Sequence, residues 1–510
     1  MNIDGALQIA TSGLANINSA MAVISQNVAN VNTPGYSQEV STQTSLTAGG
    51  QGMGVFTGSV QRQLNLALQS QVVAQNAHVA NLATTSSALS GIDSVQGTPS
   101  QSNDLASLVG ALQNAFTSLQ SNPSDISAQQ VVVSAAGNLT GQINTLSNAY
   151  GKARQSAQDG VVSTVDQLNT SLATIGTLTQ QIVETKAQGL STADLENQRD
   201  AAITTASSLV GISFVTESNG GMLAITQGGL GMEMQVPPPQ FSASSVTVSA
   251  STTYPGGGIG PITLNGQDVT ANLTGGQLGA HITLRDTTLP TYQGELDEFA
   301  NTLNTRFSAQ GLQLFTPPPG GTSTIAPAPV QTGYVGYAGT IAVNPAVLAA
   351  PSKVRDGTAA VAGSPTGASA FTPNPSGGPA SFGTLIQRVL SYSFGGDVQP
   401  GVAQPTPASS GLGPTGTLTA PFQAPSDLAG FASDLVSSQS DDVAAASSNL
   451  TTETSLQTAL QTSFSAKSAV SVDSEMSKMV ELQNAYGAVG KIIAAVQAMF
   501  SSLLQMVPAA

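Results

Sequence analysis

The chain has 510 residues and a formal net charge of −15, and charged and aromatic residues make up only 8% and 4% of it. Its 13 lysines and arginines begin only at Arg62, which argues against binding of nucleic acid or of an anionic membrane surface. Because the chain contains no cysteine, disulfides, thiolate nucleophiles and zinc sites of the cysteine type are excluded. The length by itself predicts about three domains.

The first segment carries apolar residues in steps of three and four without interruption, which predicts a helix with a heptad seam. Residues beside the seam, such as Ala6 and Gly13, are small and uncharged, which suits close packing in a crowded assembly. The predicted assembly seam consists of Ile3, Leu7, Leu14, Ile17, Met21, Ile24, Val28 and Val31.

A turn motif is expected to end this helix, because a residue before proline disfavours the α region and Pro-Gly favours a type II turn. Short extended runs follow it, with a glycine-rich stretch at 49–54. The motif is Asn32-Thr33-Pro34-Gly35-Tyr36.

The last segment mirrors the first, with apolar residues again at steps of three and four, and Pro508 closes the predicted helix. We expect it to pack beside the first helix and to serve assembly. Its predicted seam, for neighbours and for a chaperone, consists of Leu482, Tyr486, Val489, Ile493, Val496, Phe500 and Leu503.

Between the two ends, helical periodicity alternates with turn-rich sequence. Helices are predicted near 64–90, 103–120, 126–187, 194–209, 289–310 and 426–468, and a hairpin around Asn219-Gly220. The predicted class is a multi-domain α+β fold, with terminal heptad helices and a long-helix bundle that carries inserted β-rich outer parts. The expected division is an N-terminal axial segment (1–60), a helical bundle (61–210), a β-rich segment (211–288), a returning helix (289–315), a β- and loop-rich insert (316–425), the rest of the bundle (426–470) and a C-terminal axial helix (471–510).

Signals of enzymatic chemistry are missing. The sequence has no P-loop, dinucleotide fingerprint or nucleophile elbow, so we assign no catalytic, cofactor-binding or metal-binding residues and expect no cofactor. The acidic run with Glu295, Asp297 and Glu298 is interpreted as a solvated helix face. We also expect neither a cleavable signal peptide nor a membrane span, because polar residues interrupt every apolar run.

The run Ala29–Tyr36, preceded by Ser25–Val28, resembles the N-terminal signature of flagellar rod, hook and hook-associated proteins. Further segments resemble the hook-associated protein 1 family, the first hook–filament junction proteins. They are 194–200 with 209–212, 275–279 with 303–307, and 481–486 with Ile492 and Ile493, while 341–345 resembles a shorter motif of some members. Just after the turn the chain departs from the usual pattern, because Gln38 and Glu39 follow Ser37 where a basic residue is common.

The resemblance implies a non-enzymatic structural subunit of the extracellular flagellum, exported by the flagellar type III pathway. It implies a ring of identical subunits between the hook protein and the second junction protein, hook-associated protein 3, and a flagellar export chaperone. Nucleic acid and membrane are not among the expected partners.

Three other functions stay open on the sequence alone. The chain could be a hook or distal rod protein, since these share the turn motif, although they lack the long helical run at 126–187. It could be a flagellum-associated peptidoglycan hydrolase, which would need a placed acidic pair, or it could act as a surface adhesin through 316–425.

We predict that the chain ends are mobile in the monomer and become ordered on assembly, because a helix with one apolar stripe gains little stability without neighbours. In hydrogen-exchange measurements, the amides of 1–30 and 480–507 should exchange rapidly in dilute monomer and slowly in the assembled state. Strong protection of both segments in dilute monomer would contradict this prediction.

Overall fold

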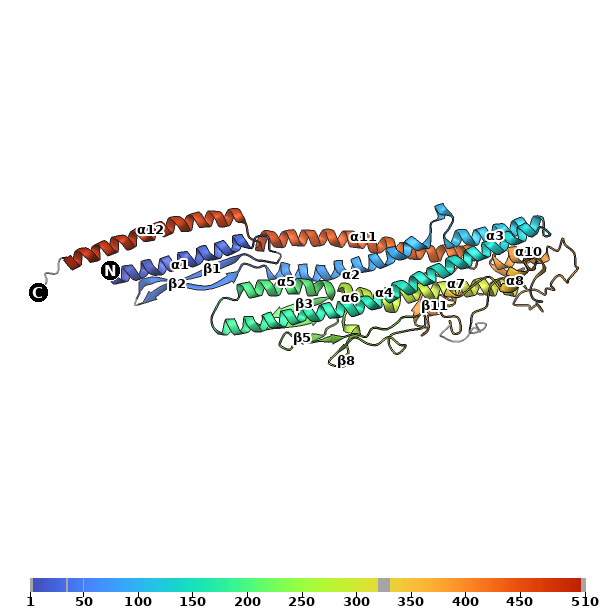
Figure 1. Ribbon diagram of the computed structural model, residues 1–510, viewed down its shortest axis with the longest axis horizontal. Helices are drawn as coiled ribbons and strands as arrows, with labels where there is room; N and C mark the ends of the chain where they lie inside the picture. The colour runs from blue at the N-terminus through green and yellow to red at the C-terminus, as the bar shows by residue number, and fades with distance from the viewer. Residues whose placement is uncertain (1–2, 34, 49, 320–330, 506–510) are drawn as a thin grey trace.

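The computed structural model describes residues 3–33, 35–48, 50–319 and 331–505. It is an elongated, mostly helical α+β molecule with five small antiparallel sheets among the described residues (Figure 1). The long terminal helices α1 (Ile3–Ala29) and α12 (Val472–Gln505) pack together at one end, as the sequence predicts. We call α1, α12 and the hairpin β1–β2 (Glu39–Ala48 and Gln51–Arg62) the tail, and residues 66–468 the body.

Long helices run along the body. They are α2 (Leu66–Gln96), α3 (Leu105–Ser121), α4 (Ile126–Ala187), α5 (Ala193–Leu209), α6 (Gly276–Thr283), α7 (Leu289–Ala309) and α11 (Leu428–Ser468). A π-turn (Leu284–Thr288) joins α6 to α7, and α11 packs along α2.

Local sequence explains where the body helices begin. Asp104, Asp125 and Asp427 precede α3, α4 and α11, and each side chain accepts hydrogen bonds from first-turn backbone N–H groups that have no partner inside the helix. Asn65 caps α2 in the same way. Short polar side chains at these four positions therefore determine where the four helices begin.

The strands of the body form small sheets between the helices. The predicted hairpin around Asn219-Gly220 is confirmed, since β3 (Ile212–Thr216) pairs antiparallel with β4 (Met222–Thr226), and β5 (Gly231–Glu233) joins them. The second sheet contains β6 (Phe241–Ser242), β7 (Thr263–Leu264) and β8 (Gln267–Asp268).

The segment 331–425 carries only short elements and returns to the body. These are α8 (Pro345–Ala349), α9 (Lys353–Asp356) and α10 (Thr384–Arg388), and the strands β9 (Asp397–Gln399), β10 (Val402–Ala403), β11 (Ser410–Leu412) and β12 (Leu418–Thr419). Tyr337, Leu385 and Val389 from this segment are buried in the same apolar cluster as α3, α4 and α7.

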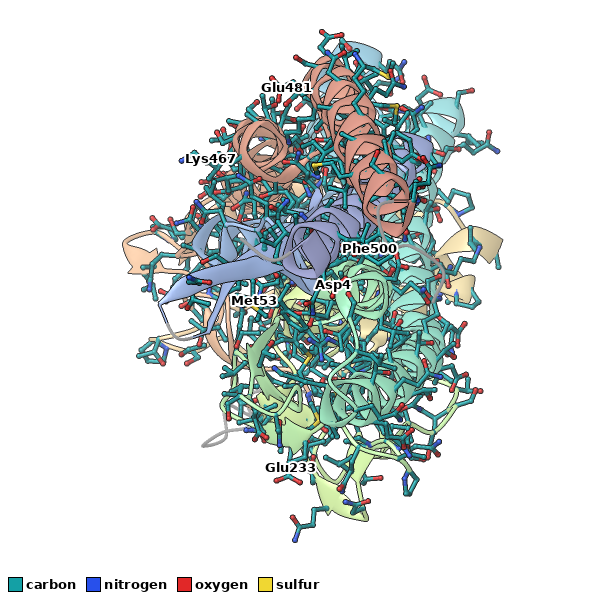
Figure 2. The ribbon with its side chains drawn as sticks, turned by 90° about the vertical axis from the view of Figure 1, so that its left-hand side faces the viewer. Asp4, Met53, Glu233, Lys467, Glu481 and Phe500 are labelled. Atoms are coloured by element: carbon teal, nitrogen blue, oxygen red, sulfur yellow. The ribbon has the colours of Figure 1, made fainter. Side chains whose placement is uncertain are left out.

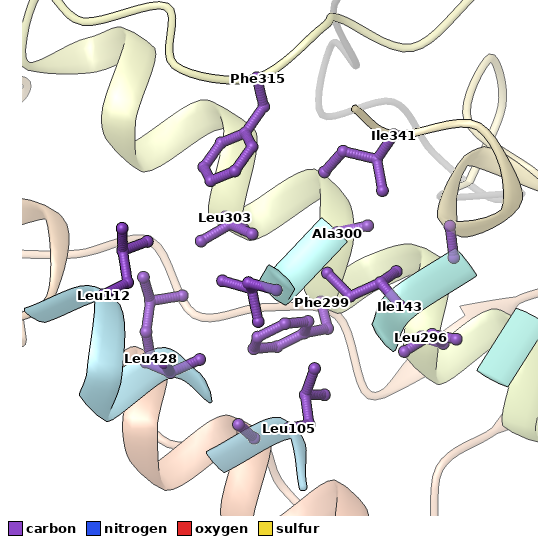
Figure 3. Close-up of a cluster of buried hydrophobic side chains, with 14 of the residues drawn as sticks. Leu105, Leu112, Ile143, Leu296, Phe299, Ala300, Leu303, Phe315, Ile341 and Leu428 are labelled. Atoms are coloured by element: carbon purple, nitrogen blue, oxygen red, sulfur yellow. The ribbon is translucent and has the colours of Figure 1, made fainter. Parts of the chain in front are cut away.

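Two apolar clusters hold the body together. The larger joins α3, α4, α7 and α11, and Figure 3 shows Leu105, Ile143 and Leu428 gathered around Phe299. The smaller joins α4 and α5 to the first two sheets. Neither cluster includes a described residue of the tail.

The acidic run on α7 is buried, so its interpretation as a solvated face is wrong. Glu295, Asp297 and Glu298 are only 2%, 1% and 6% exposed, because α7 runs through the middle of the body and is covered on nearly all sides. Asp297 accepts hydrogen bonds from the backbone N–H groups of Gly336 (2.6 Å) and Ala338 (2.8 Å). These acids thus anchor the segment after 331, including Ala408, whose N–H donates to Glu298.

Glu295 makes the stability of the body depend on pH, because burial raises the pKa of its carboxyl to about 8. In the unfolded chain this group ionises near pH 4.3. Its stabilising contribution is therefore fully present below that pH and is lost as the pH rises through about 8. We expect the free energy of unfolding to fall by on the order of 1–3 kcal/mol from about pH 5 to about pH 9.

Glu295→Gln should remove much of that pH dependence, as measured by urea denaturation at several pH values. The remaining dependence comes partly from Asp297, whose pKa burial raises to about 7. The exposed Asp93 on α2 provides a control, and Asp93→Asn should leave the pH profile as it is. Equal profiles for Glu295→Gln and the parent chain would contradict the prediction.

Candidate assembly surface

The seam of α1 is largely covered by α12 on one side and by the β1–β2 hairpin on another. Ile17 and Ile24 are buried, while the remaining described seam side chains are half-buried. Those half-buried residues are Leu7, Leu14, Met21, Val28 and Val31, the last of which lies just beyond the helix. The side chains of Ile3 and Leu503, and the whole of Pro34, lie outside what the structure describes.

On α12 the structure separates the predicted seam residues into two groups. Val496 is buried and Leu482, Val489 and Ile493 are half-buried, so these side chains face α1. Tyr486 and Phe500 are 44% and 48% exposed. The last part of α12 runs on past the N-terminal end of α1 (Figure 1).

The tail carries most of the exposed apolar surface. Among the described side chains, 20 large hydrophobic residues are exposed, and 12 of them lie on the tail, which is less than a fifth of the chain. Figure 2 looks at the molecule from the tail end and shows Met53 at the hairpin projecting to one side of α1. The 12 residues are Ile9, Val40, Leu46, Met53, Phe56, Val472, Met476, Val480, Tyr486, Ile492, Met499 and Phe500. Such an uncovered apolar surface is typical of a protein interface.

The turn motif lies where the tail meets the body, and a buried amide at the end of α1 organises it. The Nδ2 group of Asn27 donates to the carbonyl of Glu39 and to Oε2 of Glu475, both at 2.9 Å. Its Oδ1 accepts from the backbone N–H of Glu39 (2.9 Å) and from the hydroxyl of Tyr36 (3.0 Å). One side chain therefore links the turn, β1 and α12.

Gln38 occupies the position where a basic residue is common in the resembling family. Its Nε2 donates to Oε1 of Glu475 at 2.6 Å, and Lys478 contacts the same oxygen at 2.9 Å. Burial acts to raise the pKa of Glu475, but the hydrogen bonds from Asn27, Lys478 and Gln38 outweigh it and hold that pKa below its ordinary value. The side-chain amide of Gln38 thus makes the contact to Glu475 that a basic residue at this position could make.

The turn also contacts α5. The contact lies within 194–200, one of the segments that resemble the hook-associated protein 1 family. Arg62, at the end of β2, pairs with Glu196 (2.9 Å) and Asp200 (2.6 Å), and its side chain is 9% exposed. Asn197 accepts from the N–H of Ser37. Segments that are about 160 residues apart in the sequence therefore meet at one polar junction.

Glu39 is the most perturbed acid of this junction. Burial and then the negative charge of Asp194 raise the pKa of its carboxyl, Arg62 acts to lower it, and the net result is a pKa of about 7. Its Oε1 accepts a hydrogen bond from Asn197 at 3.1 Å. The junction thus contains a carboxyl that titrates near neutral pH.

No local pattern in the sequence marks Asn27, Glu475, Arg62 or Asn197 as site residues. Asn27 and Asn197 do lie inside segments that resemble the flagellar proteins, and this was the available signal. Which polar residues of those segments become buried together depends on the tertiary contacts.

No helix in the described ranges has the length and apolar character needed to cross a membrane. Within residues 3–33, 35–48, 50–319 and 331–505, no three His, Cys, Asp or Glu side chains gather as they would to hold a metal ion.

Three family models match the chain. Residues 7–36 match "Flagella basal body rod protein", residues 89–316 match "Flagellar hook-associated protein FlgK helical domain", and residues 451–506 match "Flagellar basal body rod FlgEFG protein C-terminal". The two rod matches cover most of α1 with its turn and the last part of α11 with α12, so they include Asn27 and Glu475 of the polar junction. The chain is therefore similar to axial proteins of the bacterial flagellum at both ends and over 89–316.

Two relatives support a narrower assignment. Flagellar hook-associated protein 1 of Salmonella typhimurium is 28% identical over 319 residues, which is 59% of this chain and 55% of the relative. The Bacillus subtilis protein of the same name is 28% identical over 241 residues, 45% of this chain and 47% of the relative. Over these stretches the chain is similar to flagellar hook-associated protein 1.

The chain spans about half the length of the curated relatives that it matches. Among solved structures, it is similar to the flagellar hook junction protein FlgK from Burkholderia pseudomallei. That similarity has 24% identity and a TM-score of 0.39, and it covers 51% of this chain and 47% of the other.

Replacing Arg62 should destabilise the junction, because Arg62→Ala leaves Glu196 and the largely buried Asp200 without their cation. We expect a loss of roughly 2–4 kcal/mol in the free energy of unfolding of the tail from the body. Arg355, which pairs with its neighbour Asp356 in a more exposed position, is the control, and Arg355→Ala should cost roughly 1 kcal/mol or less. Urea denaturation, monitored by hydrogen exchange of the tail amides, would measure the loss of free energy in each variant. Equal losses in the two variants would contradict the prediction.

Proposed function

We propose that the chain is a structural subunit that joins the hook to the filament of the bacterial flagellum and is needed for flagellum assembly. The observation that carries this proposal is the exposed apolar surface of the tail, formed by the helices that match flagellar rod proteins. The match of 89–316 to the helical domain of FlgK favours the junction over a hook or distal rod protein.

In this proposal the tail packs against copies of the same chain in a ring, through those parts of its seam side chains that the chain itself leaves exposed. The residues in question are the α1 seam from Leu7 to Val31, the turn 32–36 and the α12 seam from Leu482 to Phe500. The hook protein, hook-associated protein 3 and a flagellar export chaperone are the other proposed partners. The division of the chain into axial, bundle and insert segments is part of the same proposal.

Burial supplies the energy of assembly. Each exposed large apolar side chain that becomes covered contributes roughly 1.5–3 kcal/mol before the entropy of ordering is subtracted. The tail offers 12 such side chains, and each of them is more than a third exposed. A hydrolase is disfavoured by the same structure, because the α7 carboxyls are buried and hydrogen-bonded to the loops rather than presented in a cleft.

Deletion of this protein in its host should give cells that build hooks without filaments and shed flagellin into the medium. Electron microscopy of the cells and immunoblotting of the medium would measure this. Missing hooks would refute the junction role and favour a hook or rod protein.

Complementation with single variants then tests the tail surface. Phe500→Glu should leave bare hooks, because a charge replaces an apolar contact at an exposed position that does not affect the core. Leu348, which is 55% exposed on α8 of the body, provides the matched control, and Leu348→Glu should restore filaments. If the Phe500→Glu variant restored filaments, the tail surface around Phe500 would have no part in assembly.

A further inference from the structure

A groove of about 390 Å³ lies where the base of the β1–β2 hairpin meets the loop between α4 and α5. Two strongly exposed leucines line it, since Leu66 at the start of α2 is 69% exposed and Leu190 in the loop is 60% exposed. One wall is formed by residues 59–62 of β2, so the groove continues the exposed apolar surface of the tail onto the body. Apolar side chains that gather at one place on a surface are typical of a protein interface.

The groove also contains a cation that has no acidic partner. Arg62 lines the groove but is already paired with Glu196 and Asp200. Lys186, in the last turn of α4, is exposed and forms no ion pair with an acid of the described ranges. The chain as a whole has a net charge of −15 and only 13 lysines and arginines. A positive place in such an acidic protein favours a partner surface that carries an acid. We call the surface around Leu66, Leu190 and Lys186 the corner groove.

The first turns of α12 carry a surface of the opposite charge. Met476 and Val480 are 47% and 54% exposed, and Asp473 precedes Met476 by three residues, so the spacing places all three side chains on one face of the helix. This α12 face differs from the face that bonds to α1 through the buried Glu475. Asp473 forms no ion pair with a described cation. The α12 face is therefore apolar and acidic, and nothing described in the same chain neutralises its acid.

The two surfaces lie at the same level of the long axis. The N–H of Asn65, just before α2, donates to Oγ of Ser468 at the end of α11 at 3.3 Å, so α2 and α12 begin at one level. The end of α4 and the start of α12 lie on opposite sides of α1 and the hairpin (Figure 1). Two different surfaces in this arrangement allow a head-to-tail contact between copies, which is the kind of contact that can close into a ring.

We propose that the α12 face of one copy of this chain docks in the corner groove of the next copy. The two apolar side chains of the face then cover the leucines of the groove, and Asp473 pairs with Lys186. The inference rests on the proposed function, because a ring of copies brings these two surfaces together. The contact forms in the assembled state, so it belongs to the order that the mobile chain ends gain on assembly.

Introduced cysteines can report this contact, because the chain has none of its own. Lys186→Cys and Asp473→Cys in one chain should give a ladder of disulfide-linked multimers after mild oxidation of cells that carry filaments, as measured by immunoblotting of non-reducing gels. Each single variant should give no linked dimer, since the contact joins two different positions. Dimers from a single variant would indicate a like-with-like contact and would overturn the inference.

The matched control for the linked pair is Glu184→Cys combined with Asp473→Cys. Glu184 is exposed near the same end of α4 but does not line the groove. We expect on the order of tenfold less linked chain from this pair, because only cysteines held in contact have a high effective concentration. Equal yields from the two pairs would overturn the inference.

Charge reversal gives a second readout by complementation. Lys186→Glu and Asp473→Lys should each lower the number of filaments per cell several-fold, and the double variant should recover most of that loss, because opposite charges face each other again. An effect of Asp473→Lys on the start of α12 alone would not be relieved by Lys186→Glu. Circular dichroism of each variant should match the parent chain, since both positions are exposed. A double variant no better than the single variants would overturn the pairing of Lys186 with Asp473.

These results are distinguishable from a failure of the proposed function. Cells that carry filaments but give no ladder would overturn the corner-groove contact and leave the junction role. If deletion of the protein removed the hooks, the junction role would fail, and a ladder in the purified, concentrated full-length chain would still support the contact between copies.

Discussion

The buried amide of Asn27 is the contact on which the arrangement of the tail depends. It bonds to the turn, to the first strand and to α12, so the N-terminal segment and a helix more than 400 residues away in the sequence share one polar centre. An unpaired buried amide would be costly, and this cost makes the geometry specific. The glycine of the turn fits the same centre, since Gly35 has a φ of +81° and its α carbon faces Ala201 of α5.

The two parts of the molecule bury their surface in different ways. The body closes two apolar clusters within itself and can be stable by itself, with leucines and phenylalanines interlocked among four long helices. The tail helices bury one stripe against each other and leave Ile492, Met499 and Phe500 uncovered. A surface of this kind becomes stable only when neighbours cover it, which is the property expected of a subunit that works in an assembly.

Polar groups also organise the inside of the body. The carboxyls of α7 receive hydrogen bonds from the backbone of 336–338 and 408, and in this way they tie a proline-rich segment with little regular structure to the bundle. Loops rarely have enough apolar side chains to anchor themselves, and charged acceptors satisfy several backbone donors at once. The same burial keeps Glu295 protonated near neutral pH.

The sequence by itself predicted the helices, because periodicity and capping are local: the seams of α1 and α12, the long α4 and the hairpin at Asn219-Gly220 all depend on residues a few positions apart. It also predicted the similarity to flagellar axial proteins, from short motifs. It could not predict that Asn27, Glu475 and Arg62 are buried together, or that the α7 acids are internal. The local sequence around a polar side chain is the same whether that side chain faces solvent or is buried with hydrogen-bond partners. Only the tertiary structure decided these contacts, because burial of a polar group depends on which distant donor or acceptor reaches it.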